Sequence, residues 1–300
     1  MTTSELVGTG EQAVVDALRA AVRGAVIGRG DPGYDEARRV WNGLIDRRPA
    51  VIARCAGTAD VVEAVRVARA HRPVVSVRGG GHQVAGSAVC DDGLVIDLSG
   101  MRGVHVDPVA RTVRAQAGAT WADVDRATQL FGLVTPGGEV SRTGIAGFTL
   151  GGGMGVLQRR YGLACDNLRS VEIVTADGAV RTASREEHSD LFWAARGGGR
   201  GLGVVTSFEL DLHPLGPVVR KALVFYPYDQ ARTVARGCAT SPRSCRTRSR
   251  PSSSCGASRR TRRSRPGCTA PRSSSSEACT RATRRTRNRC WRRSPSWAPR

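Results

Sequence analysis

Apolar residues recur at helical spacing in three stretches of the chain. The spacing predicts amphipathic helices over Glu11–Val26, Thr58–Ala70 and Thr120–Phe131. Thr58-Ala-Asp60 and Thr120 supply the side-chain oxygens that open the second and third of these helices. Ser189–Ala195 is predicted as a further short helix.

Shorter apolar runs between these helices predict strands. Pro49–Cys55 and Pro73–Val77 flank the helix at Thr58, and this strand, helix, strand order indicates a parallel βαβ unit. From Gly93 onward we expect an antiparallel arrangement, with turns at Asp107–Ala110 and Asp177-Gly178. Its predicted strands are Leu94–Leu98, Val104–Asp107, Thr112–Ala115, Ser170–Thr175 and Val204–Leu212. The fold class is therefore α+β, with a parallel βαβ lobe and a mixed or antiparallel lobe.

The legible pattern stops after Val234, beyond which the chain has no Leu, Ile or Val. Residues 236–300 contain 19 Arg, no Lys and one acid, Glu277. Such a segment cannot bury enough apolar surface to offset chain entropy, so we expect a disordered Arg/Ser-rich tail. Its composition is what a GC-rich gene yields when read out of frame, and we hypothesise a frameshift just after Ala235.

Charge follows the same division. Residues 1–235 hold 27 Lys and Arg against 25 Asp and Glu, so the tail carries most of the formal net charge of +20. The ordered part is thus not expected to bind nucleic acid, although a nucleic-acid binder driven by the basic tail stays open as an alternative. No apolar run approaches the roughly 20 residues needed to cross a bilayer, which predicts a cytoplasmic protein without a membrane partner.

Glycine is concentrated in three loops, Arg78–Ser87, Gly144–Gly155 and Gly197–Gly203. Glycine is needed where the backbone adopts positive φ or comes too close to a ligand for a Cβ. Successive exposed amides form a nest for an anion, most often a pyrophosphate. Three such loops in a nearly neutral domain indicate an elongated ligand that crosses both lobes, as FAD would.

His82 follows the first loop directly, where it could reach the ring of a flavin and attach to it. A packing or turn histidine is the competing interpretation. The other histidines and the six tail cysteines show no metal-ligand spacing, so no metal site is predicted. Gly28–Gly33 fits G-x-G-x-x-G but is better explained as a turn, because Asp31 would repel a phosphate. Trp41, Trp121 and Trp193 are predicted to be packing residues.

Ordered motifs from about Tyr34 to Tyr228 resemble the FAD-linked oxidoreductases of the berberine bridge enzyme-like group, which belong to the PCMH-type, or vanillyl-alcohol-oxidase-type, flavoproteins. The motifs are Arg78-Gly-Gly-Gly-His82, Asp97-Leu-Ser99, Gly144-Ile-Ala-Gly-Phe-Thr-Leu-Gly-Gly-Gly153, Tyr161-Gly-Leu163, Asp166-Asn-Leu168, Val174-Thr-Ala-Asp-Gly178, Asp190-Leu-Phe-Trp-Ala194, Arg196-Gly-Gly-Gly199 and Gly203-Val-Val-Thr206.

The resemblance implies that FAD is held covalently through an 8α-histidyl bond to His82. It implies that the pyrophosphate is held by Arg78, Gly79, Gly80, Gly81, Gly86 and Ser87. It places along the rest of the cofactor Pro136, Gly137, Gly144, Gly147, Gly151, Gly152 and Val205. Val140 stands where plant-type members have a second, cysteinyl link, and Arg200-Gly-Leu-Gly203 replaces the usual Gly-Asn-Phe-Gly, so a single histidyl link is expected.

The expected organisation is a helical lead-in over residues 1–45, an FAD-binding domain over 46–217, the start of a substrate domain over 218–235, and the tail over 236–300. The resemblance implies an oxidoreductase that moves hydride to flavin from an alcohol, sugar or amine carbon of a small molecule, with oxygen as a possible acceptor. Because the substrate domain is not recognisable, we expect impaired activity and name no catalytic residue. A flavin-binding remnant without turnover is the alternative.

Overall fold

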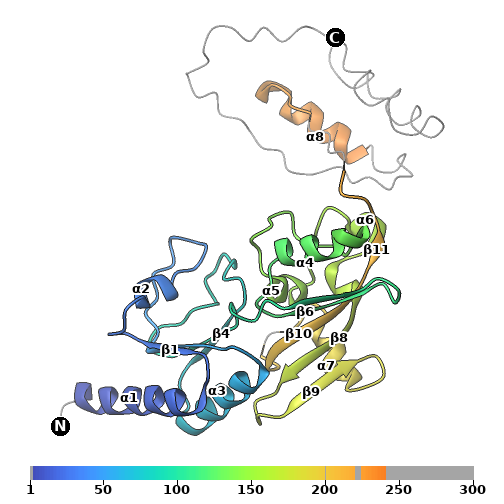
Figure 1. The fold of residues 1–300 in the computed structure, drawn as a ribbon. Helices are drawn as coiled ribbons and strands as arrows, with labels where there is room; N and C mark the ends of the chain where they lie inside the picture. The colour runs from blue at the N-terminus through green and yellow to red at the C-terminus, as the bar shows by residue number, and fades with distance from the viewer. Residues whose placement is uncertain (1–2, 200, 220–223, 241–300) are drawn as a thin grey trace. The chain divides into compact units, whose positions relative to one another are not determined.

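The computed structural model describes residues 3–199, 201–219 and 224–240. The chain divides into two compact units, Met1–Val219 and Arg220–Arg300. The first unit contains both sheets and all three glycine loops (Figure 1).

The first sheet has four strands in the order β1-β2-β4-β3. They are β1 (Ala25–Gly28), β2 (Val51–Arg54), β4 (Leu94–Asp97) and β3 (Val75–Arg78). β2 and β3 both run parallel to β4, while β1 is antiparallel to β2. The expectation that Leu94–Leu98 belongs to the antiparallel lobe is therefore wrong. All four residues of β4 are buried, since the strand lies between two parallel neighbours and is covered on both faces.

Helices cover both faces of this sheet. On one face lie α1 (Thr3–Ala21) and α3 (Thr58–His71), whose Leu18 and Val61 share a buried cluster with Ala53 and Ile96 of the strands. On the other face, α2 (Tyr34–Ala37) packs over Ile52 and Val95. The first helix ends at Ala21 rather than Val26, because Ala25 and Val26 pair with β2 as part of β1.

The second sheet has five strands in the order β5-β6-β10-β8-β9, and all neighbours are antiparallel. They are β5 (Val104–Asp107), β6 (Thr112–Gln116), β10 (Val204–Asp211), β8 (Leu168–Val174) and β9 (Val180–Ser184). The hairpin turns expected after Asp107 and at Asp177-Gly178 are present.

Short elements join these strands. They are α4 (Trp121–Thr128), η1 (Gln129–Phe131), β7 (Leu133–Val134), α5 (Ile145–Leu150), α6 (Gln158–Tyr161), η2 (Ala164–Asn167), α7 (Ser189–Ala195) and β11 (His213–Pro214). In the second unit, η3 (Tyr228–Gln230) precedes α8 (Ala231–Thr240), so helix continues past the boundary expected at Ala235. The rest of the predicted tail lies outside the described residues.

One continuous core joins the two sheets of the first unit. It includes Val61 of α3, Ile96 of β4 and Phe208 of β10. The Thr58 hydroxyl at the start of α3 donates to a Glu172 carboxylate oxygen of β8 at 2.8 Å. The predicted α+β class with one largely parallel and one antiparallel sheet is thus confirmed. Within the part of the chain that can be described, no helix is both long and apolar enough to cross a bilayer.

Candidate functional site

The first glycine loop leaves the carboxyl end of β3, at the edge of the first sheet. Arg78 ends the strand, and its guanidinium donates a hydrogen bond to the Ala37 carbonyl. Gly81 has φ +63°, and its carbonyl accepts a hydrogen bond from the Trp41 backbone amide at 3.0 Å. Gly86 has φ +71° and packs so closely on Ile45 that a Cβ would lie 2.6 Å from that side chain. The predicted pyrophosphate residues therefore lie on a loop that only glycine can form.

The first and second loops meet backbone to backbone at Gly80 and Gly144. A Cβ on Gly80 would lie 2.6 Å from the Gly144 Cα, and a Cβ on Gly144 would lie 2.7 Å from the Gly80 Cα. Gly79 is nearly as confined, 3.1 Å from the Ala117 carbonyl oxygen. Two segments that are distant in sequence are therefore brought together through glycines, as the cofactor hypothesis requires.

Other glycines of the second loop face open space. A Cβ on Gly147, in α5, or on Gly152, with φ +101°, would meet no atom within 4 Å. Both lie in exposed or partly exposed positions. A Cβ on Gly151 would be 3.1 Å from the Gly147 carbonyl oxygen. These positions leave backbone uncovered next to the Gly80–Gly144 junction, where a flat ligand could approach.

Pro136 and Gly137 lie against this second loop. A Cβ on Gly137 would be 2.6 Å from the Trp121 ring, and one on Gly155 would overlap the Gly137 carbonyl oxygen. The third loop also reaches the second, because the Gly199 amide donates to the Leu150 carbonyl at 3.4 Å. Val205, in β10, is buried with 5% exposure. The structure thus joins the three loops, while Ser87 lies exposed farther along the first.

Unpaired polar groups lie along these loops. Among the described residues, the N–H groups of Gly79, Gly80, Gly81 and His82 have no hydrogen-bond partner. Buried and also without one are Arg78 Nε, Thr149 Oγ1 and Thr135 Oγ1. Clustered donors of this kind suit a diphosphate, and unsatisfied buried groups are costly unless something binds them. The residues present therefore fit FAD.

His82 is half-buried, and its ring stacks on Trp41 with centroids 4.8 Å apart and planes at 20°. Trp41 is 61% exposed and Trp193 is 77% exposed, so the prediction that both are packing residues is wrong. Trp121 is fully buried and confirms it. Sequence reasoning missed the contact between Trp41 and His82, because no periodicity links residues so far apart in the chain.

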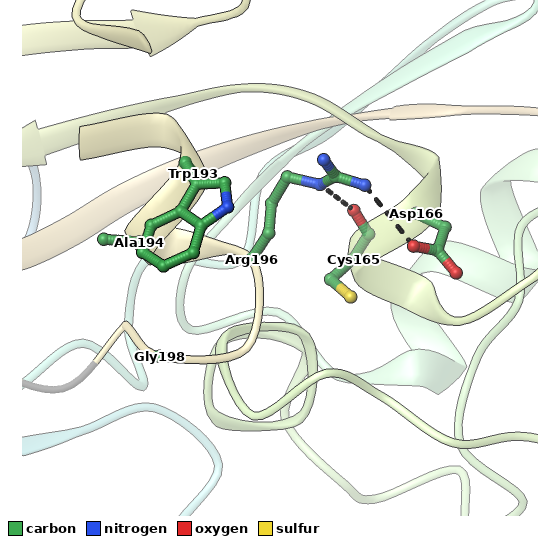
Figure 2. A pocket seen from close by; sticks show the side chains of 6 residues that line it. All are labelled: Cys165, Asp166, Trp193, Ala194, Arg196 and Gly198. Carbon is green, nitrogen blue, oxygen red and sulfur yellow. Dashed lines mark hydrogen bonds and ion pairs between the residues drawn. The ribbon is translucent and has the colours of Figure 1, made fainter. Parts of the chain in front are cut away.

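A pocket of about 370 Å³ lies apart from the predicted cofactor residues, none of which lines it. Figure 2 shows Arg196 between the two segments that form it: Nε donates to the Cys165 carbonyl at 2.9 Å and a terminal nitrogen contacts Asp166 at 3.4 Å. Burial raises the pKa of the Cys165 thiol. This thiol is therefore a poor nucleophile, and the arginine serves to join η2 to the end of α7.

Residues 49–184 match the family model described as "FAD binding domain". An FAD-linked oxidoreductase of Aspergillus terreus is 40% identical over 216 residues, which cover 71% of this chain and 44% of that protein. The (R)-6-hydroxynicotine oxidase of Paenarthrobacter nicotinovorans is 39% identical over 195 residues, covering 65% of this chain and 43% of that one.

Solved structures agree. The 6-hydroxy-D-nicotine oxidase of Arthrobacter nicotinovorans superposes with a TM-score of 0.63 at 39% identity, over 64% of this chain and 43% of that one. A xylooligosaccharide oxidase of Myceliophthora thermophila gives 0.64 at 29% identity, over 67% and 43%. This chain therefore spans less than half the length of the relatives it matches. Through the domain at residues 49–184, it belongs to the FAD-linked oxidoreductases.

Proposed function

We propose that the first unit binds FAD along its three glycine loops and holds it covalently through an 8α bond to His82. In this proposal the amides of Gly79–Gly81, together with Arg78, Gly86 and Ser87, bind the pyrophosphate. Along the rest of the cofactor lie Pro136, Gly137, Gly144, Gly147, Gly151, Gly152 and Val205.

The observation that carries the proposal is the junction of Gly80 with Gly144, beside which the amides of Gly79–His82 have no partner among the described residues. Backbone amides make no demand on the charge state of a side chain, so they bind a diphosphate over a wide pH range. The Arg78 guanidinium, whose Nε is unsatisfied, adds a fixed positive charge at the same loop.

The bound flavin would supply a two-electron acceptor for hydride from a substrate carbon. We propose an alcohol, sugar or amine substrate and oxygen as the final acceptor. Relatives named as a hydroxynicotine oxidase and a xylooligosaccharide oxidase support the amine and sugar classes. No residue of this chain is assigned the role of general base, and turnover without the remaining length of the relatives is expected to be weak.

The first test is whether flavin survives denaturation. The chain is produced with FAD, precipitated with acid and washed, and the pellet is examined for flavin fluorescence on a denaturing gel. We expect fluorescence in the wild type and none in His82→Ala, which should still bind FAD reversibly. A wild type that never takes up FAD would refute the proposal. Bleaching of the flavin absorbance by an amine or a sugar under anaerobic conditions then distinguishes an enzyme from a binding remnant.

A further inference from the structure

Trp41 lies in a segment that braces the first glycine loop on both sides of His82. Its backbone amide donates to the Gly81 carbonyl, just before His82, at 3.0 Å. The side-chain amide of the next residue, Asn42, donates to the Val84 carbonyl, just after it, at 2.8 Å. The backbone on each side of the histidine is therefore fixed by two consecutive residues.

The brace continues along the loop. Arg47 donates to the carbonyls of Gly86 at 3.2 Å and Val89 at 2.8 Å, and Ile45 packs on Gly86. These contacts hold the loop as a whole but do not touch the imidazole. Only one contact orients the ring itself, within the described residues: its stack on the Trp41 indole.

The imidazole of His82 makes no hydrogen bond among the described residues. Without such a bond, a half-buried ring could rotate about its two side-chain torsions. Stacking at 4.8 Å and 20° restricts that rotation while leaving both ring nitrogens free at the edge. An indole that is 61% exposed contributes little to the core, so its position is better explained by the contact with histidine.

We infer that Trp41 is a positioning residue that aims the His82 imidazole for attachment of the flavin. The inference rests on the proposed function. In the attachment, an N–C bond forms between the imidazole and the 8α carbon, and one N–H and one C–H bond break. The two hydrogens and the electron pair stay on the flavin, which becomes reduced. Dioxygen then reoxidises it and is released as hydrogen peroxide.

The test compares Trp41→Leu, which removes the aromatic face, with Trp41→Phe, which restores one. Trp193→Leu is the matched control, since Trp193 is also largely exposed but lies in the other sheet's pocket. Each cofactor-free protein is mixed with FAD, and the fraction of covalent flavin on denaturing gels is followed with time, beside the total flavin bound before denaturation.

We expect Trp41→Leu to bind FAD but to attach it more slowly by roughly tenfold or more, because orientation is lost. Trp41→Phe should recover most of the rate, and Trp193→Leu should match the wild type. Equal rates in wild type and Trp41→Leu would overturn the inference alone. A wild type with only reversible flavin would overturn the proposed tether and the inference together.

A second measurement needs no cofactor. The proton resonances of the His82 ring, assigned by their loss in His82→Ala, should carry an aromatic ring-current shift that disappears in Trp41→Leu and persists in Trp193→Leu. This readout remains informative if Trp41→Leu takes up FAD poorly. Ring resonances that do not move when Trp41 is replaced would show that the two rings are not stacked, and the inference would fail.

Discussion

His213 is held as a neutral imidazole. Its Nε2 lies 2.6 Å from the Asn167 side-chain oxygen, and the Asn167 amide nitrogen already donates to the Tyr161 and Leu163 carbonyls. That oxygen must therefore accept, so Nε2 carries the proton. The ring also stacks on Tyr161, with centroids 4.1 Å apart.

Burial lowers the pKa of His213 below its ordinary value of 6.5, Asp211 opposes the shift, and Arg160 adds to it. A base with a depressed pKa in the folded state takes up its proton more readily when unfolded. Stability is therefore complete above 6.5 and is lost as the pH falls below it.

We predict that the free energy of unfolding in urea falls more in the wild type than in His213→Gln between about pH 7.5 and about pH 5.5. The variant keeps a side-chain amide that can donate to Asn167 but cannot gain charge in this range. Equal losses in the two proteins would show that His213 does not contribute to the pH dependence.

At single positions, the sequence predicted the kinds of residue at the site better than their partners. Glycine at positions 80 and 144 is legible because few other reasons place it in such dense runs. The stack of Trp41 on His82 could not be predicted, since it depends on how the segment after α2 folds back over the loop.

At the scale of elements, the two kinds of glycine in α5 and its flanks make opposite predictions. Gly80→Ala places a Cβ 2.6 Å from the Gly144 Cα, and neither backbone can move away cheaply. We expect a loss of stability on the order of 1–3 kcal/mol together with loss of FAD binding. Unfolding in urea and titration with FAD measure the two effects.

Gly147→Ala is the matched case in open space. The substitution should leave the stability of the cofactor-free protein unchanged or raise it by up to about 1 kcal/mol, because alanine favours the helix. FAD affinity should nevertheless fall, since the added methyl occupies the face proposed for the cofactor. If this variant binds FAD as tightly as the wild type, Gly147 does not contact it.

Elements with a clear period were predicted well, and those without one were not. Val104–Asp107 alternates between partly buried and exposed positions, and the predicted strand has the observed bounds. Leu94–Asp97 is apolar on both faces, so its pattern carries no information about direction, which the pairing with β2 and β3 determines. α5 was hidden because glycine-rich sequence does not show helical spacing.

For the whole first unit, one core connects the two sheets, so the loops that extend from them are held in fixed relation. A ligand that contacts all three loops should therefore stabilise the unit as a whole rather than one loop. The nearly neutral charge of residues 1–235 agrees with a site that binds its anion through local amides and one arginine.

The central claim is that this arrangement holds FAD with a bond to His82. The most direct measurement is mass spectrometry of the tryptic peptide that follows Arg78, prepared from protein produced with flavin. The account predicts that this peptide carries the mass of FAD, and that fragmentation places it on His82. An unmodified peptide from protein without flavin, or a flavin attached to a different residue, would contradict the account.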